Sequence, residues 1–167
     1  MRDYTSAIRE RVIVFEGGMG ATLEQLDLSL EKDYKLPGRA HEVLILNRPD
    51  VIEVVHQSFI DAGATALQTA TFQASRLKLD EWGLGEHTHE INLRGAEIAR
   101  KAAGDHFVAG SIGPTGYLPA SDDPTLGEIS FRTLADGFAE QALGLIEGGV
   151  DLILVETAQD ILEVKAA

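Results

Sequence analysis

The segment Gly148–Asp160, with the sequence GGVDLILVETAQD, decides how the rest of the chain is interpreted. Two glycines close a preceding helix, an apolar run follows, and Glu156 stands where that run ends. An apolar run of this length between such boundaries is typical of a strand buried on both faces of a parallel sheet. Thr157, with Asp160 three residues later, fits the capping box that begins a helix.

Glu156 is therefore expected at the carboxyl end of a central parallel strand, where open α/β sheets and α/β barrels bind ligands. A carboxylate that leaves water there needs a cation or a hydrogen-bond donor. The alternative interpretation of Glu156 is an ordinary solvated loop acid.

Strand and helix patterns alternate along the whole chain. The expected strands are 12–15, 65–69, 107–112 and 150–155. Helices are expected over 21–30, from Pro49 to Gly63, over 88–103, from Phe131 to the glycines at 148–149, and after Asp160, whereas 117–127 is expected to be a polar loop. These connection lengths suit right-handed crossovers between parallel strands. The sequence thus predicts one α/β domain over residues 1–167, built from about four parallel βα units.

The composition excludes several classes of function. Asp and Glu outnumber Lys and Arg by 27 to 14, so the formal charge of -13 argues against nucleic-acid and anionic-membrane partners. The absence of Cys excludes disulfides, thiolate metal sites and a catalytic thiol within this sequence. No apolar run approaches membrane-spanning length, and the first eleven residues lack a signal-peptide pattern, so a cytoplasmic location is expected.

Distinctive residues stand at every expected strand end, which is the signature of a ligand-binding face. They are Glu16 with Gly17 and Gly18, Thr69 with Thr71, Ser111 with Gly113, and Glu156. The two acids could hold an ammonium group or act as an acid–base pair, and the residues alone leave both options open.

The glycine-rich turn after the first expected strand does not fit a dinucleotide fingerprint, because the third glycine and the ribose-binding acid are missing. The backbone amides of Gly17 and Gly18 suit a small carboxylate instead, with a simple tight turn as the alternative. His87 and His89 lie near a helix start, where their spacing turns them apart, so no metal site is expected there. His56 is expected to be packed on the flank of its helix.

Several longer stretches carry a specific resemblance. They are Glu16–Gly20, Asn47–Val51, Ala62–Ala64, Thr69–Phe72, Arg76–Leu79, Gly110–Gly116 and Glu156–Ala167. In this order they resemble the homocysteine S-methyltransferase family, and most closely its cobalamin-dependent members. The resemblance spans nearly the whole chain.

The resemblance implies a (β/α)8 barrel, which needs about 250 residues, so this chain would supply its first four βα units, the N-terminal half. In the family, homocysteine binds at the carboxyl rim, where a zinc ion held by three cysteines activates its thiol. The thiolate then attacks a methyl group on cobalamin or another donor. Because those cysteines belong to later strands, this chain is expected to carry no catalytic residue and no metal ligand. On its own it is expected to be inactive, with cobalamin and methyltetrahydrofolate bound by other domains.

By the same resemblance, Glu16 and Glu156 would grip the ammonium group of homocysteine. The expected neighbours of its amino-acid end are Gly17, Gly18, Thr71 and Ser111. The family usually has Asp at position 16, Glu at 68 and Asn at 70, where this chain has Glu16, Gln68 and Ala70. These departures bear on substrate affinity and substrate choice, but not on the fold.

A second class of function stays open at this stage. The chain could be a non-catalytic half-barrel, or an open α/β small-ligand-binding module, that oligomerises. The edges of its outer strands would otherwise be unpaired, which favours pairing with another chain. The expected partners are therefore homocysteine and either the remaining half of the barrel or a second copy of this chain.

Overall fold

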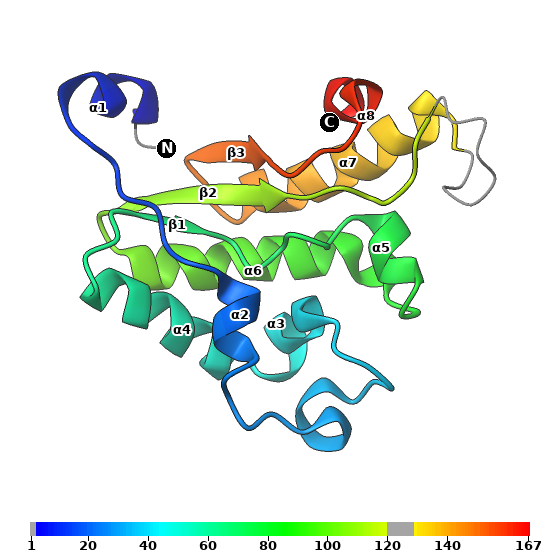
Figure 1. Cartoon of the computed structure of the whole chain (residues 1–167), viewed down its shortest axis with the longest axis horizontal. Coiled ribbons are helices and arrows are strands. Elements are labelled where there is room, and N and C mark those ends of the chain that lie inside the picture. The colour runs from blue at the N-terminus through cyan, green and yellow to red at the C-terminus, as the bar shows by residue number, and fades with distance from the viewer. Residues whose placement is uncertain (1–2, 120–128) are drawn as a thin grey trace.

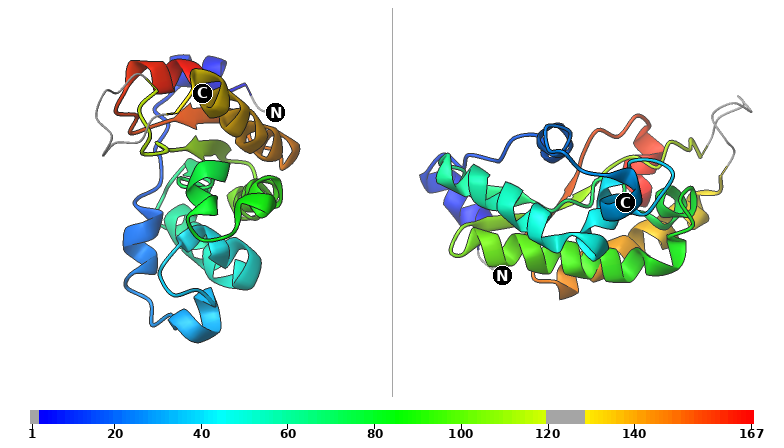
Figure 2. Two further views of the ribbon diagram at one scale, coloured as in Figure 1. Left: turned by 90° about the vertical axis from the view of Figure 1, so that its right-hand side faces the viewer. Right: turned by 90° about the horizontal axis from the view of Figure 1, so that it is seen from below.

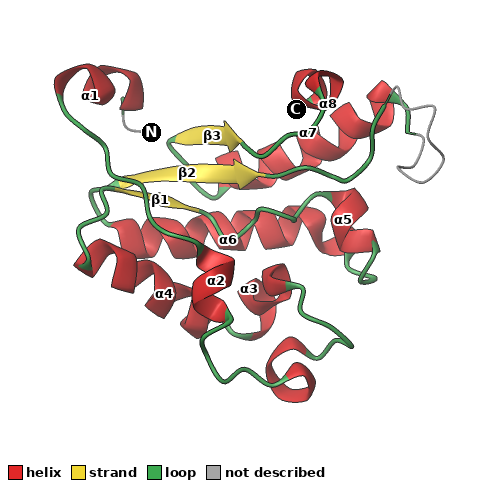
Figure 3. Ribbon diagram, viewed as in Figure 1, coloured by secondary structure: helices red, strands yellow, loops and turns green. Residues whose placement is uncertain are grey.

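A three-stranded parallel sheet forms the centre of the computed structural model, which describes residues 3–119 and 129–167 (Figures 1 and 3). The strands are β1 (Ala66–Gln68), β2 (Phe107–Ile112) and β3 (Leu152–Val155), in the order β1-β2-β3. Gln68 pairs with Ala109, and Ser111 pairs with Leu154. The carboxyl ends of the three strands therefore meet at one edge of the sheet, as the sequence predicted.

The expected first strand, 12–15, is reduced to a single parallel bridge between Phe15 and Ala66. The Ala66 amide donates to the Val14 carbonyl at 3.0 Å, and the Glu16 amide donates to the Ala66 carbonyl at 3.1 Å. Val12 is 83% exposed, because no described strand lies on the outer side of this segment. The prediction of four complete strands is therefore not confirmed.

The helices connect the strands and cover the sheet. They are α1 (Tyr4–Glu10), α2 (Met19–Leu23), α3 (Leu44–Asn47), α4 (Pro49–Asp61), α5 (Arg76–Asp80), α6 (Thr88–Ala103), α7 (Phe131–Glu147) and α8 (Ile161–Ala166). A π-helical turn, η1 (Leu30–Tyr34), and two 3-10 turns, η2 (His41–Val43) and η3 (Gly85–His87), complete the list. No helix among the described residues is long and apolar enough to cross a membrane.

Helices α4, α6 and α7 lie side by side along the same face of the sheet (Figures 1 and 2). Pro49 occupies the first turn of α4, and Gly63, at φ +101°, follows its end. The Ser130 side chain caps α7 by accepting from the Thr133 amide at 3.0 Å. These helices were expected, and the structure confirms them.

Two local expectations are wrong. The helix predicted over 21–30 is only the five-residue α2, and the chain turns again at η1. Thr157 does not cap the last helix, because its φ of +60° lies in the left-handed region and the helix begins four residues later. Asp160 caps α8 instead, accepting from the Leu162 amide at 2.7 Å. Of the loop predicted over 117–127, residues 120–127 lie outside the described residues.

Strand β3 is less buried than its apolar sequence predicted. Val155 is 37% exposed and the other three residues of β3 are half-buried, whereas all six residues of β2 are buried. The expectation of burial on both faces is wrong for β3, because it is an edge strand among the residues that the structure describes.

Asp151, the one acid inside the apolar run, is buried beside a cation. Its carboxylate pairs with the Arg100 guanidinium of α6 and accepts from the Val108 amide at 3.0 Å. A charge inside a protein is tolerated when it is paired and hydrogen-bonded. This contact ties the start of β3 to both β2 and α6.

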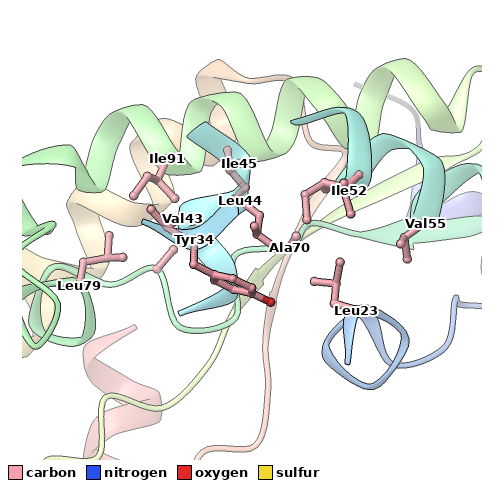
Figure 4. Close-up of a cluster of buried hydrophobic side chains, with 12 residues drawn as sticks. Leu23, Tyr34, Val43, Leu44, Ile45, Ile52, Val55, Ala70, Leu79 and Ile91 are labelled. Carbon is pink, nitrogen blue, oxygen red and sulfur yellow. The ribbon is translucent and has the colours of Figure 1, made fainter. Parts of the chain in front are cut away.

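Two apolar clusters fill the space around the helices. One lies between α2, α3, α4 and α6 and includes Tyr34, Leu44, Ile52 and Ile91 (Figure 4). The other lies between the sheet, α6 and α7. The first cluster supports the segment between α2 and α4, which lies beside the carboxyl ends of the strands.

The contact between α6 and α7 depends on the absence of a side chain at Gly144. A Cβ atom there would lie 2.7 Å from the His89 carbonyl oxygen and 3.0 Å from the Asn92 Cβ. Gly137, on the same helix, has nothing within 4 Å of such an atom. We expect Gly144→Ala to lower the free energy of unfolding by about 1–3 kcal/mol through overpacking, measured by urea denaturation.

Gly137→Ala is the matched control. It should raise the free energy of unfolding by up to about 1 kcal/mol, because Ala favours a helix over Gly. Equal effects of the two substitutions would contradict a specific close contact at Gly144.

Candidate functional site

A cavity of about 340 Å³ opens at the carboxyl ends of the strands. Five of the six predicted site residues line it, namely Glu16, Gly17, Gly18, Ser111 and Glu156. Thr71, the sixth, does not line the cavity and is fully buried. The structure thus brings five of the six residues together around one cavity, whereas Thr71 lies outside its lining.

Glu156 is held by the hydroxyl group of Ser111. The Ser111 Oγ donates to Glu156 Oε1 at 2.6 Å, and the Glu156 amide donates to the Ile112 carbonyl at 3.0 Å. Because β2 and β3 are adjacent and parallel, Ser111 near the end of β2 and Glu156 just after β3 come together. A neutral donor orients this carboxylate without cancelling its charge.

Two threonines after β1 fix the position of Ser111. The Ser111 amide donates to Thr69 Oγ1 at 2.9 Å, and Thr71 Oγ1 donates to the Ser111 carbonyl at 2.8 Å. The two hydroxyl oxygens lie 2.6 Å apart, which closes a ring of hydrogen bonds around one peptide segment. Gln141 of α7 adds a bond to the Thr71 carbonyl at 2.9 Å. Thr71 therefore supports the residue that holds Glu156.

Glu16 also lines the cavity and is held by a histidine. Its Oε2 lies 3.2 Å from Nδ1 of His56, and the two side chains are 1% and 0% exposed. Burial raises the pKa of Glu16 above its usual value, and the negative charge of Glu156 adds to this shift, whereas the hydrogen bond from His56 offsets it in part. His56 is packed, as expected, and is fully buried.

The glycines beside Glu16 bring backbone into the cavity wall. A Cβ atom on Gly17 would lie 2.9 Å from Cε1 of Phe59, so α4 packs directly against this backbone. Within the described chain, the Gly17 and Gly18 amides donate to no other group. They can therefore serve as hydrogen-bond donors to a ligand.

Glu42 is a third acid in the cavity wall, and sequence reasoning missed it. It belongs to η2, and its Oε1 accepts from the Gln73 amide at 2.9 Å. Burial raises the pKa of this carboxyl group. The only available signal was an acid followed by an apolar run, which does not indicate a ligand site.

Two basic side chains, Arg39 and His41, also line the cavity. Both pair with Glu24, which is about half exposed, and His41 Nδ1 lies 2.9 Å from the Tyr34 hydroxyl. The cavity wall thus combines three carboxyl groups with two basic groups that already have an acidic partner. This balance favours a ligand with a positive charge.

The described residues do not fit a metal ion. The sequence has no Cys, and the described part of the chain contains no group of three His, Asp or Glu side chains that could hold a metal. His87 lies 3.1 Å from Glu90, and His89 lies 2.8 Å from Glu147, so the two histidines have separate acidic partners. These side chains cannot form a zinc site of the kind that the family resemblance implies.

The turn Gly113–Gly116 is fixed from both sides rather than aimed at the cavity. The Gly113 amide donates to the Phe72 carbonyl at 2.9 Å. Glu163 of α8, which is buried, accepts from the Thr115 amide at 2.8 Å and from the Thr115 hydroxyl at 2.7 Å. This turn links β2 to α8 and supports the cavity indirectly.

The chain belongs to the homocysteine S-methyltransferase family, whose model matches residues 13–167. It is 37% identical over 172 residues to the methionine synthases of Mycobacterium tuberculosis (strain ATCC 25618 / H37Rv) and Mycobacterium leprae (strain TN). Each alignment covers 99% of this chain but only 14% of the relative's length.

The fold is similar to that of the homocysteine methyltransferase MmuM from Escherichia coli. Its metallated form matches with a TM-score of 0.74 at 24% identity, and its oxidized form with a TM-score of 0.77 at 23% identity. These matches cover 95% and 97% of this chain, and 58% and 59% of the MmuM chain. The α/β architecture with a parallel sheet is therefore that of a partial barrel of this type.

The buried carboxyl group of Glu42 predicts a pH-dependent stability. Its pKa is raised in the folded state, so the folded chain binds this proton more tightly than the unfolded chain. Glu42 therefore contributes favourably to the free energy of unfolding at low pH. This contribution is lost as the pH rises above about 4.3, the ordinary pKa of a Glu carboxyl group. We expect Glu42→Gln to be more stable than the wild type at pH 8, by on the order of 1 kcal/mol.

Urea denaturation across pH 4–8, without ligand, measures this difference, which should shrink toward pH 4. Glu97→Gln, at an exposed position of α6, is the control and should show a difference that does not change with pH. A Glu42→Gln variant that loses stability equally at every pH would contradict the argument.

Proposed function

We propose that this chain is part of a cytoplasmic methyltransferase that methylates the thiol of homocysteine to give methionine. Within that enzyme, the function of this chain is to bind the amino-acid end of homocysteine. The observation that carries the proposal is the pair of acids, Glu16 and Glu156, that line one cavity in a member of this family.

In this proposal, the two carboxylates receive the ammonium group of homocysteine. Ser111 of β2 orients Glu156 through its hydroxyl group, and Thr71 holds Ser111 by a hydrogen bond to its carbonyl. The free amides of Gly17 and Gly18 are then donors for the carboxylate of the same ligand. The ligand's two opposite charges are thus met by acids and by backbone amides, which suits a zwitterionic amino acid.

The thiol chemistry is assigned to other parts of such an enzyme. Since the described residues do not fit zinc, we derive no step through a metal from them. Zinc ligands, and the sites for cobalamin and methyltetrahydrofolate, would belong to other segments. The barrel would then be completed by four further βα units packed beside β3 and beside the segment 12–15.

Binding of L-homocysteine to this chain tests the amino-acid site. A charge-assisted hydrogen bond contributes about 1.5–3 kcal/mol, so Glu156→Gln should raise the Kd roughly tenfold or more by titration calorimetry. The desamino analogue keeps the thiol and carboxylate but lacks the ammonium group, so it should bind weakly and be insensitive to this substitution.

Glu97→Gln provides the matched control, because it removes one surface charge far from the cavity wall. It should leave the Kd unchanged. Equal binding of homocysteine and its desamino analogue would show that the acids do not recognise an ammonium group.

The isolated chain should bind no zinc tightly and transfer no methyl group to homocysteine. Both properties can be measured directly, by metal analysis after dialysis and by methionine formation from a methyl donor. Stoichiometric zinc in the dialysed chain would overturn the assignment of the metal site to other segments.

The second candidate is a non-catalytic half-barrel or open α/β module that binds a small ligand and oligomerises. The observation in its favour is the exposure of the segment 12–15 and of Val155 at the two sides of the sheet. A dimer in sedimentation velocity, with no gain of methyl transfer on adding the missing half, would favour this candidate.

A further inference from the structure

We propose that His56 is a positioning residue of this site: its Nδ1–H holds the Glu16 carboxylate in the orientation that receives a ligand ammonium group. The inference rests on the proposed function for the identity of the ligand. The His56–Glu16 contact itself does not depend on that function.

The contact joins two side chains that are removed from solvent. Glu16 Oε2 and His56 Nδ1 are 3.2 Å apart, and neither side chain is more than 1% exposed. His56 lies on α4 among the buried residues Ile52 and Val55, so its ring is fixed by packing. A fixed ring gives the carboxylate a donor in a defined direction, as catalytic and binding groups require.

Helix α4 controls both the backbone and the side chain at this point. Phe59, one turn after His56, lies against Gly17, where a Cβ atom would be 2.9 Å from its ring. The backbone after Glu16 is therefore held by the same helix that holds its carboxylate. A displacement of α4 would move the whole Glu16–Gly17 wall of the cavity.

The hydrogen-bond partners of His56 determine which nitrogen carries the proton. Its Nε2 is buried and has no hydrogen-bond partner within the described residues. An ionised carboxylate can only accept, so the bond to Glu16 requires a proton on Nδ1. A second proton on Nε2 would leave a buried charged donor unpaired, which costs more than an unpaired neutral acceptor. The neutral Nδ1–H tautomer follows.

The charged groups around Glu16 explain why it needs this donor. Glu156, which follows β3, and Glu42, in η2, line the same cavity as Glu16. The basic groups Arg39 and His41 are paired with Glu24. Burial and the charge of Glu156 both raise the pKa of Glu16, whereas His56 and the Gln68 backbone lower it. The pKa of Glu16 is raised overall, so loss of the His56 donor would raise it further and would weaken the attraction of Glu16 for a cation.

Nuclear magnetic resonance of the labelled full chain tests the inference without a ligand. Long-range ¹H–¹⁵N spectra should show His56 as the neutral Nδ1–H tautomer. The ¹³C signal of the Glu16 carboxyl carbon should titrate at a higher pH in His56→Leu than in the wild type. In His56→Asn, whose amide nitrogen can replace Nδ1, the midpoint should stay close to that of the wild type.

A proton on Nε2 instead of Nδ1, a fully protonated ring at pH 7, or an unchanged Glu16 midpoint in His56→Leu would overturn the inference. Val55→Ala, a packing change at the preceding residue of α4, is the control and should leave the midpoint unchanged. Should His56→Leu fail to fold, the tautomer in the wild type and the midpoint in His56→Asn still decide.

Titration with L-homocysteine separates this inference from the proposed function. At pH 7, His56→Leu should weaken binding by roughly tenfold or more, whereas His56→Asn should retain binding within about threefold. If the wild-type chain has the expected tautomer but does not bind homocysteine, the proposal that homocysteine is the ligand is refuted. The proposal that His56 positions Glu16 then still stands. Normal binding by His56→Leu would refute that role alone.

Discussion

A carboxylate that leaves water needs another donor in its place, and this requirement organises the structure around the cavity. The donors come from different elements: β2 provides Ser111 for Glu156, and α4 provides His56 for Glu16. The backbone amide of Gln73 serves Glu42. The packing of the strands and helices therefore determines which donor reaches each acid.

The cavity acids Glu156 and Glu42 differ in their partners from Asp151, the buried acid at the start of β3. Asp151 has the permanent cation Arg100 beside it, so its charge is balanced within the fold. Ser111 gives Glu156 only a neutral hydroxyl group, and the Gln73 amide gives Glu42 no charge either. A neutral donor fixes a carboxylate but leaves its negative charge to act on whatever enters the cavity. The first kind of pairing stabilises the sheet, and the second leaves a site suited to a cation.

The sequence was sufficient for features that depend on local pattern. The paired glycines and the apolar run that follows them predicted a strand that ends at Glu156. Ser111 was predicted at the end of another strand, 107–112. Glu16 and His56 are 40 residues apart, so their contact depends on how α4 packs and not on any local pattern. Glu42 reaches the cavity through an irregular segment, for which periodicity has no predictive value. The segment 12–15 has strand-forming residues, but a strand also needs neighbours, and among the described residues Ala66 alone is bridged to it.

The single bridge at Phe15 has a thermodynamic consequence for the cavity. Glu16 follows directly after a segment that is attached on one side only and exposed on the other. Ordering such a segment has an entropic cost, which any ligand that needs Glu16 in place must offset. A contact that pairs with the free side of residues 12–15 would remove part of that cost. By linkage, the ligand would then raise the affinity of that contact by the same factor by which the contact raises the affinity for the ligand, although the two touch different atoms.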